Sequence, residues 1–288
     1  MKDLLLIIKE NLLKKEPVVL VTITESSGST PRHAGARMLV GKGPDSAPLR
    51  LWGSIGGGIM EYSAIEDAAN LLQSRRPHPA DIQKKYLLHS AEAGESGAVC
   101  GGEMTASFRY IDSEDSELFK EIENEKTSCG IVCIFGGGHV AQELVPILAR
   151  LDFRCVVFDD RKEFVKAELF PGVEKIILGD FEHIGKSITL TENDYAVVLT
   201  RGHIWDLEAW AFALESRAAY IGVIGSKSKH EFVKEKLRQR GFSHEAINAP
   251  RVHAPIGIKI KSETPAEIAV SIAAELIQCR ALYLEGGL

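Results

Sequence analysis

Residues 131–160, IVCIFGGGHVAQELVPILARLDFRCVVFDD, constrain the fold more than any other stretch of this chain. An apolar run rich in β-branched residues ends in Gly136-Gly137-Gly138. Apolar residues at helical spacing follow over Val140–Arg150, and a second apolar run, Cys155–Phe158, ends in the acid Asp159. The stretch therefore predicts a strand, a glycine turn, a helix and a second strand that closes on a carboxylate.

The glycine turn has the pattern G-x-G-x-x-A, carried by Gly136, Gly138 and Ala141. The first glycine permits the tight turn, the second lets the backbone approach a pyrophosphate, and the alanine lets the helix pack on the strand. The first N–H groups of the helix then face the phosphate, and Asp159 stands where an acid accepts ribose hydroxyls. The pattern predicts a Rossmann-like unit that binds NAD rather than NADP. The alternative, a unit that keeps the fold without binding a nucleotide, remains open.

Bulk composition narrows the class of protein. A chain of 288 residues is long enough for two domains, and a formal net charge of −6 argues against nucleic acid as the main partner. No apolar run approaches the roughly 20 residues that span a bilayer, and the N-terminus lacks the apolar core of a signal peptide. We therefore expect a cytoplasmic protein without membrane attachment. Its five scattered cysteines, odd in number, suit a reducing compartment.

The order of predicted elements indicates an α/β fold. Strands are expected over 18–24, 37–40, 51–55, 82–88 and 105–111, and then over 131–135, 155–158, 174–178, 195–200 and 219–224. Helices are expected over 1–16, 61–73, 140–150, 207–216, 229–240 and 266–282. We predict a smaller N-terminal α/β domain (1–112), a charged linker (113–128) and a Rossmann-like domain with a doubly wound, mostly parallel sheet (129–288).

Two features of the first half of the chain are candidates for binding a ligand or reacting with one. Gly56-Gly57-Gly58 lead directly into a predicted helix, which makes them a second candidate anion cradle. Cys100 is followed by two glycines, so a bulky group could approach its sulfur. A thiolate there is either a soft ligand for a transition metal or a nucleophile, and a small apolar residue in a turn is an equally open interpretation.

Two loops follow strands of the second half. His203 and Asp206 form either a general base with its orienting acid or the cap of the next helix. Ser226 and Lys227 could hold a phosphate, although Ser226 is also a typical N-cap. The remaining histidines lack ligand spacing and are interpreted as surface or core residues: His78, His89, His183, His230, His244 and His253. No nucleophile–base–acid set is legible, so no catalytic residue is assigned.

Several segments resemble the XdhC/CoxI family, and they occur in the family's order along nearly the whole chain. In the first half they are GSTPRHAGARMLV (28–40), GSIGGGIMEYSAIEDA (53–68) and CGGEM (100–104). In the second half they are GGGHVAQEL (136–144), FDDRKEF (158–164), TRGHIWD (200–206), YIGVIGSKSK (220–229) and PIGIKIKSETPAEIAVSIAAELI (255–277).

The resemblance implies an accessory factor for xanthine or carbon monoxide dehydrogenases. Such proteins bind the molybdenum cofactor, a pterin dithiolene that carries a phosphate, while a cysteine desulfurase supplies its terminal sulfur, and then insert it into a molybdenum hydroxylase. The family is often dimeric, so a homodimer is expected. By the resemblance Cys100 would contact the molybdenum or its sulfur, and Arg32 with Gly56-Gly57-Gly58 would line the cofactor site. Further cofactor-binding residues would be Gly136, Gly138, His139, Asp159, His203 and Ser226.

The sequence thus predicts a molybdenum-cofactor chaperone, more a non-enzymatic maturation factor than an enzyme. The alternative is an NAD-dependent oxidoreductase in which the glycine turn holds NAD and His203 acts on a substrate. A third hypothesis is a nucleotide sensor that regulates the target enzyme without chemistry of its own.

Overall fold

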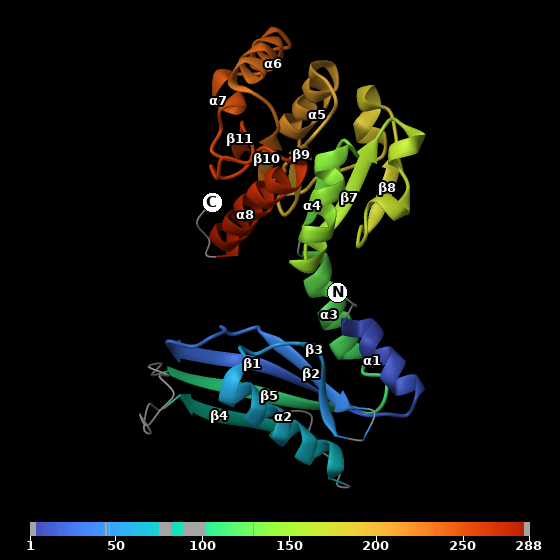
Figure 1. Cartoon of the computed structure of the whole chain (residues 1–288), viewed down its shortest axis with the longest axis vertical. Helices are drawn as coiled ribbons and strands as arrows, with labels where there is room; N and C mark the ends of the chain where they lie inside the picture. Colours follow the sequence, from blue (N-terminus) through green and yellow to red (C-terminus); the bar gives the residue numbers. More distant parts are fainter. Residues whose placement is uncertain are drawn as a thin grey trace. The chain divides into compact units, whose positions relative to one another are not determined.

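The structure, a computed structural model, describes residues 4–43, 45, 47–74, 82–88, 102–128 and 130–284 (Figure 1). The chain divides into two compact units, Lys2–Glu123 and Asn124–Leu288, and the division falls within helix α3 (Ser116–Ser128). Each unit is described by itself. Within the described residues no helix is long and apolar enough to cross a membrane.

The N-terminal unit is built on a five-stranded antiparallel sheet with the order β3-β2-β1-β5-β4. Its strands are β1 (Val18–Gly28), β2 (Arg37–Lys42), β3 (Pro48–Gly53), β4 (Ile82–Leu88) and β5 (Gly102–Ile111). The strand predicted over 51–55 ends earlier, at Gly53. There φ is +68°, and a Cβ would lie 2.2 Å from the carbonyl oxygen of Arg37, so the position at the end of the strand requires glycine.

Helices cover both faces of this sheet, because side chains alternate along its central strand. Val19 and Val21 of β1 pack with α2 (Gly58–Gln73) on one face. On the other face, Val18 and Leu20 pack with α1 (Leu4–Leu13) and α3. The stretch expected as a linker thus forms α3, and its apolar residues are buried in the core of the N-terminal unit: Leu118, Phe119 and Ile122.

The C-terminal unit has a six-stranded parallel sheet with the order β11-β10-β9-β6-β7-β8. Its strands are β6 (Ile131–Phe135), β7 (Arg154–Asp159), β8 (Lys175–Leu178), β9 (Tyr195–Val198), β10 (Tyr220–Val223) and β11 (Val252–His253). Numbered from β6 as the first strand, this is the order 3-2-1-4-5-6 of dinucleotide-binding folds. The predicted Rossmann-like, doubly wound sheet is confirmed, and its order reverses between β6 and β9.

Both faces of the four central strands β10, β9, β6 and β7 are buried, which explains why these strands are continuous apolar runs in the sequence. Helices α4 (His139–Arg150) and α8 (Pro265–Leu284) pack together on one face (Figure 1). On the other face lie α5 (His203–Glu215), α6 (Lys227–Gln239) and the 3-10 segment η3 (Phe181–Lys186). Helix α7 (His244–Ile247) and the 3-10 turns η1 (Lys162–Phe164) and η2 (Ala167–Leu169) complete the unit.

Candidate functional site

The turn between β6 and α4 is fixed by its first glycine. Gly136 has φ of +111°, and a Cβ there would lie 2.5 Å from the carbonyl oxygen of Leu199. Its N–H donates to the carbonyl oxygen of Phe158 at 2.8 Å, which ties the turn to the neighbouring strand. This position therefore accepts glycine alone, and the reason is close approach of backbone to backbone.

The third glycine faces outward. Gly138 precedes α4 as its N-cap with ordinary φ of −72°, and nothing lies within 4 Å of the place a Cβ would occupy. The next residue, His139, is exposed. The amide groups that open α4 are thus approachable, and the positive end of the helix dipole favours an anion there. The geometry suits a phosphate.

Asp159 lies behind the turn rather than on its open side. Its side chain is 1 % exposed, and one oxygen accepts the Gly137 N–H at 2.7 Å. Arg161 supplies three further hydrogen bonds, from its backbone N–H at 3.0 Å, Nε at 2.9 Å and Nη2 at 2.9 Å. A carboxylate offers about four acceptor sites, so the protein itself uses all of them. A ribose hydroxyl would have to displace one of these donors.

The ionisation of Asp159 follows from these contacts. Burial alone would raise the pKa of the carboxyl group, but the hydrogen bonds from Arg161 and Gly137 outweigh burial and hold the pKa below its ordinary value. The charge is therefore kept at neutral pH and binds the glycine turn to the end of β7.

An ion pair joins the loops on the two sides of the glycine turn. Arg201, after β9, places Nη2 3.1 Å from Oδ2 of Asp160, after β7. Because β6 lies between β7 and β9 in the sheet, the pair connects loops that flank Gly136–Gly138. Burial, and then the neighbouring Asp159, raise the pKa of Asp160 against the opposing charge of Arg201.

The predicted pair of His203 and Asp206 is not brought together. Asp206 is fully buried, accepts the hydroxyl of Thr200 at 2.6 Å and forms an ion pair with Lys229 of α6. His203 is exposed, and its ring lies edge-on to Phe232 with centroids 5.5 Å apart. The acid thus joins α5 to α6 and does not orient the histidine.

Ser226 stands at the start of α6, after β10. Its hydroxyl accepts the backbone N–H of Lys229 at 3.2 Å, which makes it the N-cap of the helix. Of the two interpretations left open by the sequence, the capping contact is the one seen in the structure.

The second glycine turn, before α2, meets Arg32. Gly56, Gly57 and Gly58 have φ of +126°, +77° and +64°. A Cβ on Gly56 would lie 2.5 Å from Cγ of Pro31 and 3.5 Å from Cγ of Arg32. The segment Pro31-Arg32 therefore lies directly against the turn, and the Arg32 side chain is exposed.

Three amide groups of this second turn, those of Ile55, Gly56 and Gly57, are already occupied. Glu61, in the first turns of α2, accepts the N–H groups of Ile55 and Gly57, each at 3.1 Å. The same carboxylate accepts the hydroxyl of Ser54 at 2.6 Å and pairs with Arg50 at 2.6 Å. Burial alone would raise its pKa, but the hydrogen bonds and the charge of Arg50 hold the pKa below its ordinary value. The cradle thus contains a built-in anion.

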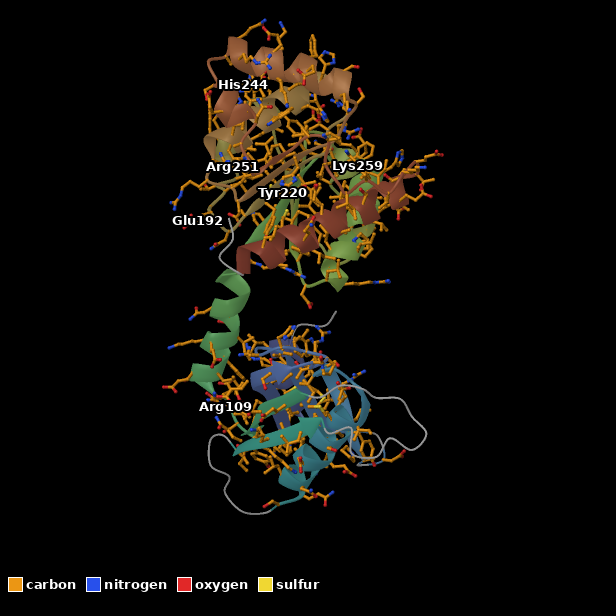
Figure 2. All side chains as sticks on the ribbon, turned by 90° about the vertical axis from the view of Figure 1, so that its left-hand side faces the viewer. Arg109, Glu192, Tyr220, His244, Arg251 and Lys259 are labelled. Atoms are coloured by element: carbon orange, nitrogen blue, oxygen red, sulfur yellow. The ribbon has the colours of Figure 1, made fainter. Side chains whose placement is uncertain are left out.

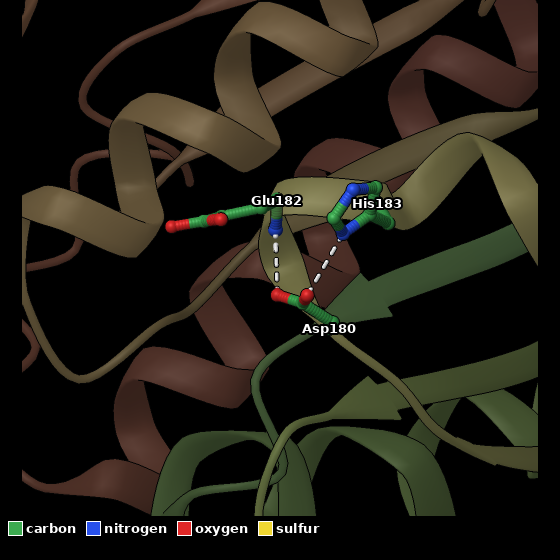
Figure 3. A group of neighbouring side chains, drawn as sticks. All are labelled: Asp180, Glu182 and His183. Atoms are coloured by element: carbon green, nitrogen blue, oxygen red, sulfur yellow. Dashed lines mark hydrogen bonds and ion pairs between the residues drawn. The ribbon is translucent and has the colours of Figure 1, made fainter.

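A group of exposed side chains at η3 has the composition of a metal site. Ligand atoms of Asp180, Glu182 and His183 lie within 4.8 Å of one another (Figure 3). Asp180, however, is the N-cap of η3: it accepts the Glu182 N–H at 2.9 Å and contacts Nδ1 of His183 at 2.8 Å. Capping accounts for this arrangement without an ion.

Comparison with known proteins identifies the family. Residues 132–276 match the XdhC Rossmann domain, and residues 12–84 match the XdhC and CoxI family. The chain belongs to the XdhC/CoxI family.

Two curated relatives resemble the chain over part of their length. It is 30 % identical over 265 residues to the uncharacterized protein YqeB of Escherichia coli K12, covering 92 % of this chain and 44 % of that protein. It is 30 % identical over 147 residues to a probable subunit of xanthine dehydrogenase from Bacillus subtilis, covering 51 % of this chain and 42 % of the relative. The chain thus spans less than half the length of each of these curated relatives.

The fold is shared with a crystal structure described as a xanthine dehydrogenase from Bacillus halodurans. The TM-score is 0.75 at 22 % identity, with 98 % of this chain and 96 % of the other covered. At this identity the likeness shows the fold alone.

Of the residues that the XdhC/CoxI resemblance singles out, Cys100 lies outside the described part of the chain and remains a prediction. The sequence did not reveal that Glu61 occupies the second turn or that Arg161 saturates Asp159. A signal for each existed: Glu61 follows Gly57 by one helical turn, and Arg161 lies two residues beyond Asp159.

Proposed function

We propose that this protein is a maturation factor for a molybdenum hydroxylase of the xanthine dehydrogenase type. It binds the phosphate-bearing molybdenum cofactor, holds it while a cysteine desulfurase supplies the terminal sulfur, and delivers it to the client enzyme. Membership of the XdhC/CoxI family supports this role, as does the similarity to a probable subunit of xanthine dehydrogenase from Bacillus subtilis.

The observation that carries the proposal is the open N-terminus of α4 at Gly138. The cofactor ends in a phosphate, and helix amide groups beneath a glycine that faces open space fit such an anion. Gly136 fixes the path of the turn, and Asp159 with Arg161 holds it from behind. These residues bind and orient the cargo, while the cargo itself supplies the metal chemistry of the client.

The N-terminal unit offers a second candidate contact in the exposed Arg32. Because Glu61 occupies the amide groups of Ile55 and Gly57, an anion near this turn would meet the Arg32 guanidinium and the amide groups that open α2. Gly56 serves by letting the segment Pro31-Arg32 lie against the turn. Cys100 is proposed as the sulfur ligand of the molybdenum.

Cofactor retention tests the proposal. Purified protein is incubated anaerobically with freshly released molybdenum cofactor and desalted, and bound molybdenum and pterin are measured. We expect stoichiometric retention by the wild type and at least a tenfold loss, about 1.4 kcal/mol or more, in Gly138→Val, because the side chain blocks the phosphate. Gly185→Val is the control outside the loops that flank this turn, since the nearest atom to its Cβ position, Cε2 of Phe212, lies at an ordinary 3.7 Å.

The same retention assay on Arg32→Ala and Cys100→Ala tests which of the two units binds the cofactor. Loss in these variants with normal retention in Gly138→Val would assign the cofactor to the N-terminal unit. Absence of retention by the wild type would contradict the chaperone role. Light scattering on the loaded and unloaded protein tests the proposed homodimer.

A second candidate function is an NAD-dependent oxidoreductase, which the strand order of the C-terminal sheet favours. The saturation of Asp159 and the separation of His203 from Asp206 weigh against it. Titration with NADH, followed by its fluorescence, tests this candidate. Tight binding that disappears in Gly138→Val, together with failure to retain the molybdenum cofactor, would favour it over the maturation factor.

A further inference from the structure

A small cavity lies at the edge of the C-terminal sheet opposite the glycine turn. Its volume is about 170 Å³, well above the roughly 10–15 Å³ that one water needs. Tyr195 and Tyr220, the first residues of β9 and β10, line it, so it lies where these strands begin. Three further lining residues bear on its chemistry: Arg251, His253 and Cys279.

The imidazole of His253 is held in place by neighbours from two elements. Its Nδ1 lies 3.2 Å from Oε1 of Glu275 on α8, and its ring stacks on Tyr220 with centroids 4.5 Å apart. Glu275 is itself fixed, because it accepts the Tyr220 hydroxyl at 2.5 Å and the Gly257 N–H at 2.8 Å. Tyr220 lies in the interior of the unit (Figure 2).

Cys279 completes the cluster. It follows Glu275 by four residues on α8, so both side chains lie on the same face of the helix, and it lines the cavity with His253. A hydrogen bond with Cys279, and then one with Glu275, raise the pKa of His253 to about 9 against the opposing effect of burial. The histidine therefore carries a proton at neutral pH.

All three cysteines of the described residues are buried, and Cys279, which is 7 % exposed, belongs to the same apolar core as Cys155. Cys133 and Cys155 are strand residues in the two apolar cores, and both are fully buried. Burial raises the pKa of each of these thiols. Neither lines the cavity, so neither has a basic partner together with space for a reactant.

The remaining charged groups around the cavity are engaged. The Arg251 guanidinium donates to backbone carbonyl oxygens at the end of α5 and beyond it, at distances of 2.7–3.1 Å: those of Leu214, Ser216 and Ala218. The Tyr220 hydroxyl donates to Glu275. Among the charged groups that line the cavity, His253 is therefore the one that faces Cys279.

We propose that Cys279, His253 and Glu275 form a thiol-reactive site that takes a small disulfide in this cavity. In the reacting ion pair the cysteine proton resides on His253. The sulfur of Cys279 attacks one sulfur of the disulfide R–S–S–R, a Cys279–S–S–R bond forms, and the original S–S bond breaks. The leaving thiolate takes the proton from His253 and departs as R–SH. Glu275 is a positioning residue that orients the imidazole.

The test uses the full chain and bis(2-hydroxyethyl) disulfide at neutral pH, with acid quenching and peptide mapping by mass spectrometry. We expect Cys279 to form the mixed disulfide at least about tenfold faster than Cys133 and Cys155 in the same sample. This comparison within one molecule needs no variant. Equal rates at the three cysteines would overturn the proposal.

Variants then separate a chemical role from a structural one. His253→Gln should slow the reaction at Cys279 about tenfold at pH 7, and the difference should narrow as the pH approaches about 8.5, where an ordinary thiol ionises. His244→Gln is the matched control, because His244 is exposed at the start of α7 and does not line the cavity (Figure 2). An unchanged rate and pH profile in folded His253→Gln would contradict the assigned role.

Discussion

The two glycine turns of this protein share a sequence pattern but differ in how their amide groups are used. At Gly56–Gly58 the carboxylate of Glu61 comes from the helix that the turn opens and occupies the N–H groups of Ile55 and Gly57. At Gly136–Gly138 the carboxylate of Asp159 comes from the neighbouring strand and binds the turn from behind. Gly138 faces open space, as do Gly57 and Gly58, so openness alone does not separate the two turns. They differ in the acid: Glu61 takes two N–H groups of its turn, whereas Asp159 takes only that of Gly137.

The largest effect on stability is expected for Gly136→Ala, which strains the backbone of the turn between β6 and α4. The added Cβ would lie 2.5 Å from a carbonyl oxygen at a φ of +111°. Strain in the left-handed region and overpacking together predict a loss of about 4 kcal/mol in the free energy of unfolding of the C-terminal unit. Hydrogen exchange measured by mass spectrometry assigns the loss to a unit. Unchanged protection of β6 and β9 would contradict the close approach.

Asp159→Asn removes the charge that holds the same turn from behind. The amide cannot accept all the donors of Arg161 and Gly137, and it leaves the partly buried guanidinium with only the longer ion pair to Asp160, at 3.8 Å. We expect a loss of about 3 kcal/mol in the C-terminal unit and weaker cofactor retention, because the turn is no longer fixed. Equal stability with weaker retention would instead show that Asp159 contacts the ligand directly.

Glu61→Gln tests the built-in anion of the turn before α2 and should cost the N-terminal unit about 2 kcal/mol. The folded-state pKa of Glu61 is lowered from the model-compound value of 4.5, so its contribution is present above that pH and is lost as the pH falls below it. Urea unfolding at pH 7 and pH 3 should show a difference between wild type and variant that shrinks in acid. Glu66→Gln, at an exposed position of the same helix, is the control. A larger difference in unfolding free energy between wild type and Glu61→Gln at pH 3 than at pH 7 would contradict the lowered pKa of Glu61.

These contrasts show what sequence could and could not predict. The strands of the parallel sheet were predictable because both their faces are buried and they read as apolar runs. Strand β11 was not, since its two residues pair with β10 through tertiary contact alone. The turn at Gly136 was predictable from its glycines. Three of the four hydrogen bonds on Asp159 were not, because they depend on Arg161 folding back onto the strand end.

The same limit applies to the cavity cluster. His253 was interpreted as a surface or core residue because sequence spacing offers it no partner. Its contact with Glu275 joins residues 22 positions apart, brought together by the packing of α8 on the sheet. Helical spacing alone could have paired Glu275 with Cys279, but it could not place a histidine beside them.

The smallest effect on stability is expected for Gly138→Ala, which makes it the sharpest test of the comparison. Its φ of −72° suits any residue and nothing lies within 4 Å of the Cβ position, so the free energy of unfolding should change by less than about 1 kcal/mol. Cofactor retention should nevertheless fall, because the methyl group stands where the phosphate approaches.

At the turn before α2, Gly57→Ala should have the opposite effects, lowering the free energy of unfolding while leaving cofactor retention unchanged. Its φ of +77° and ψ of −171° lie in a region that only glycine adopts readily, so alanine should cost about 1–3 kcal/mol, whereas retention should hold because Glu61 already accepts the Gly57 N–H. Loss of retention in Gly57→Ala, with normal retention in Gly138→Ala, would exchange the roles of the two turns.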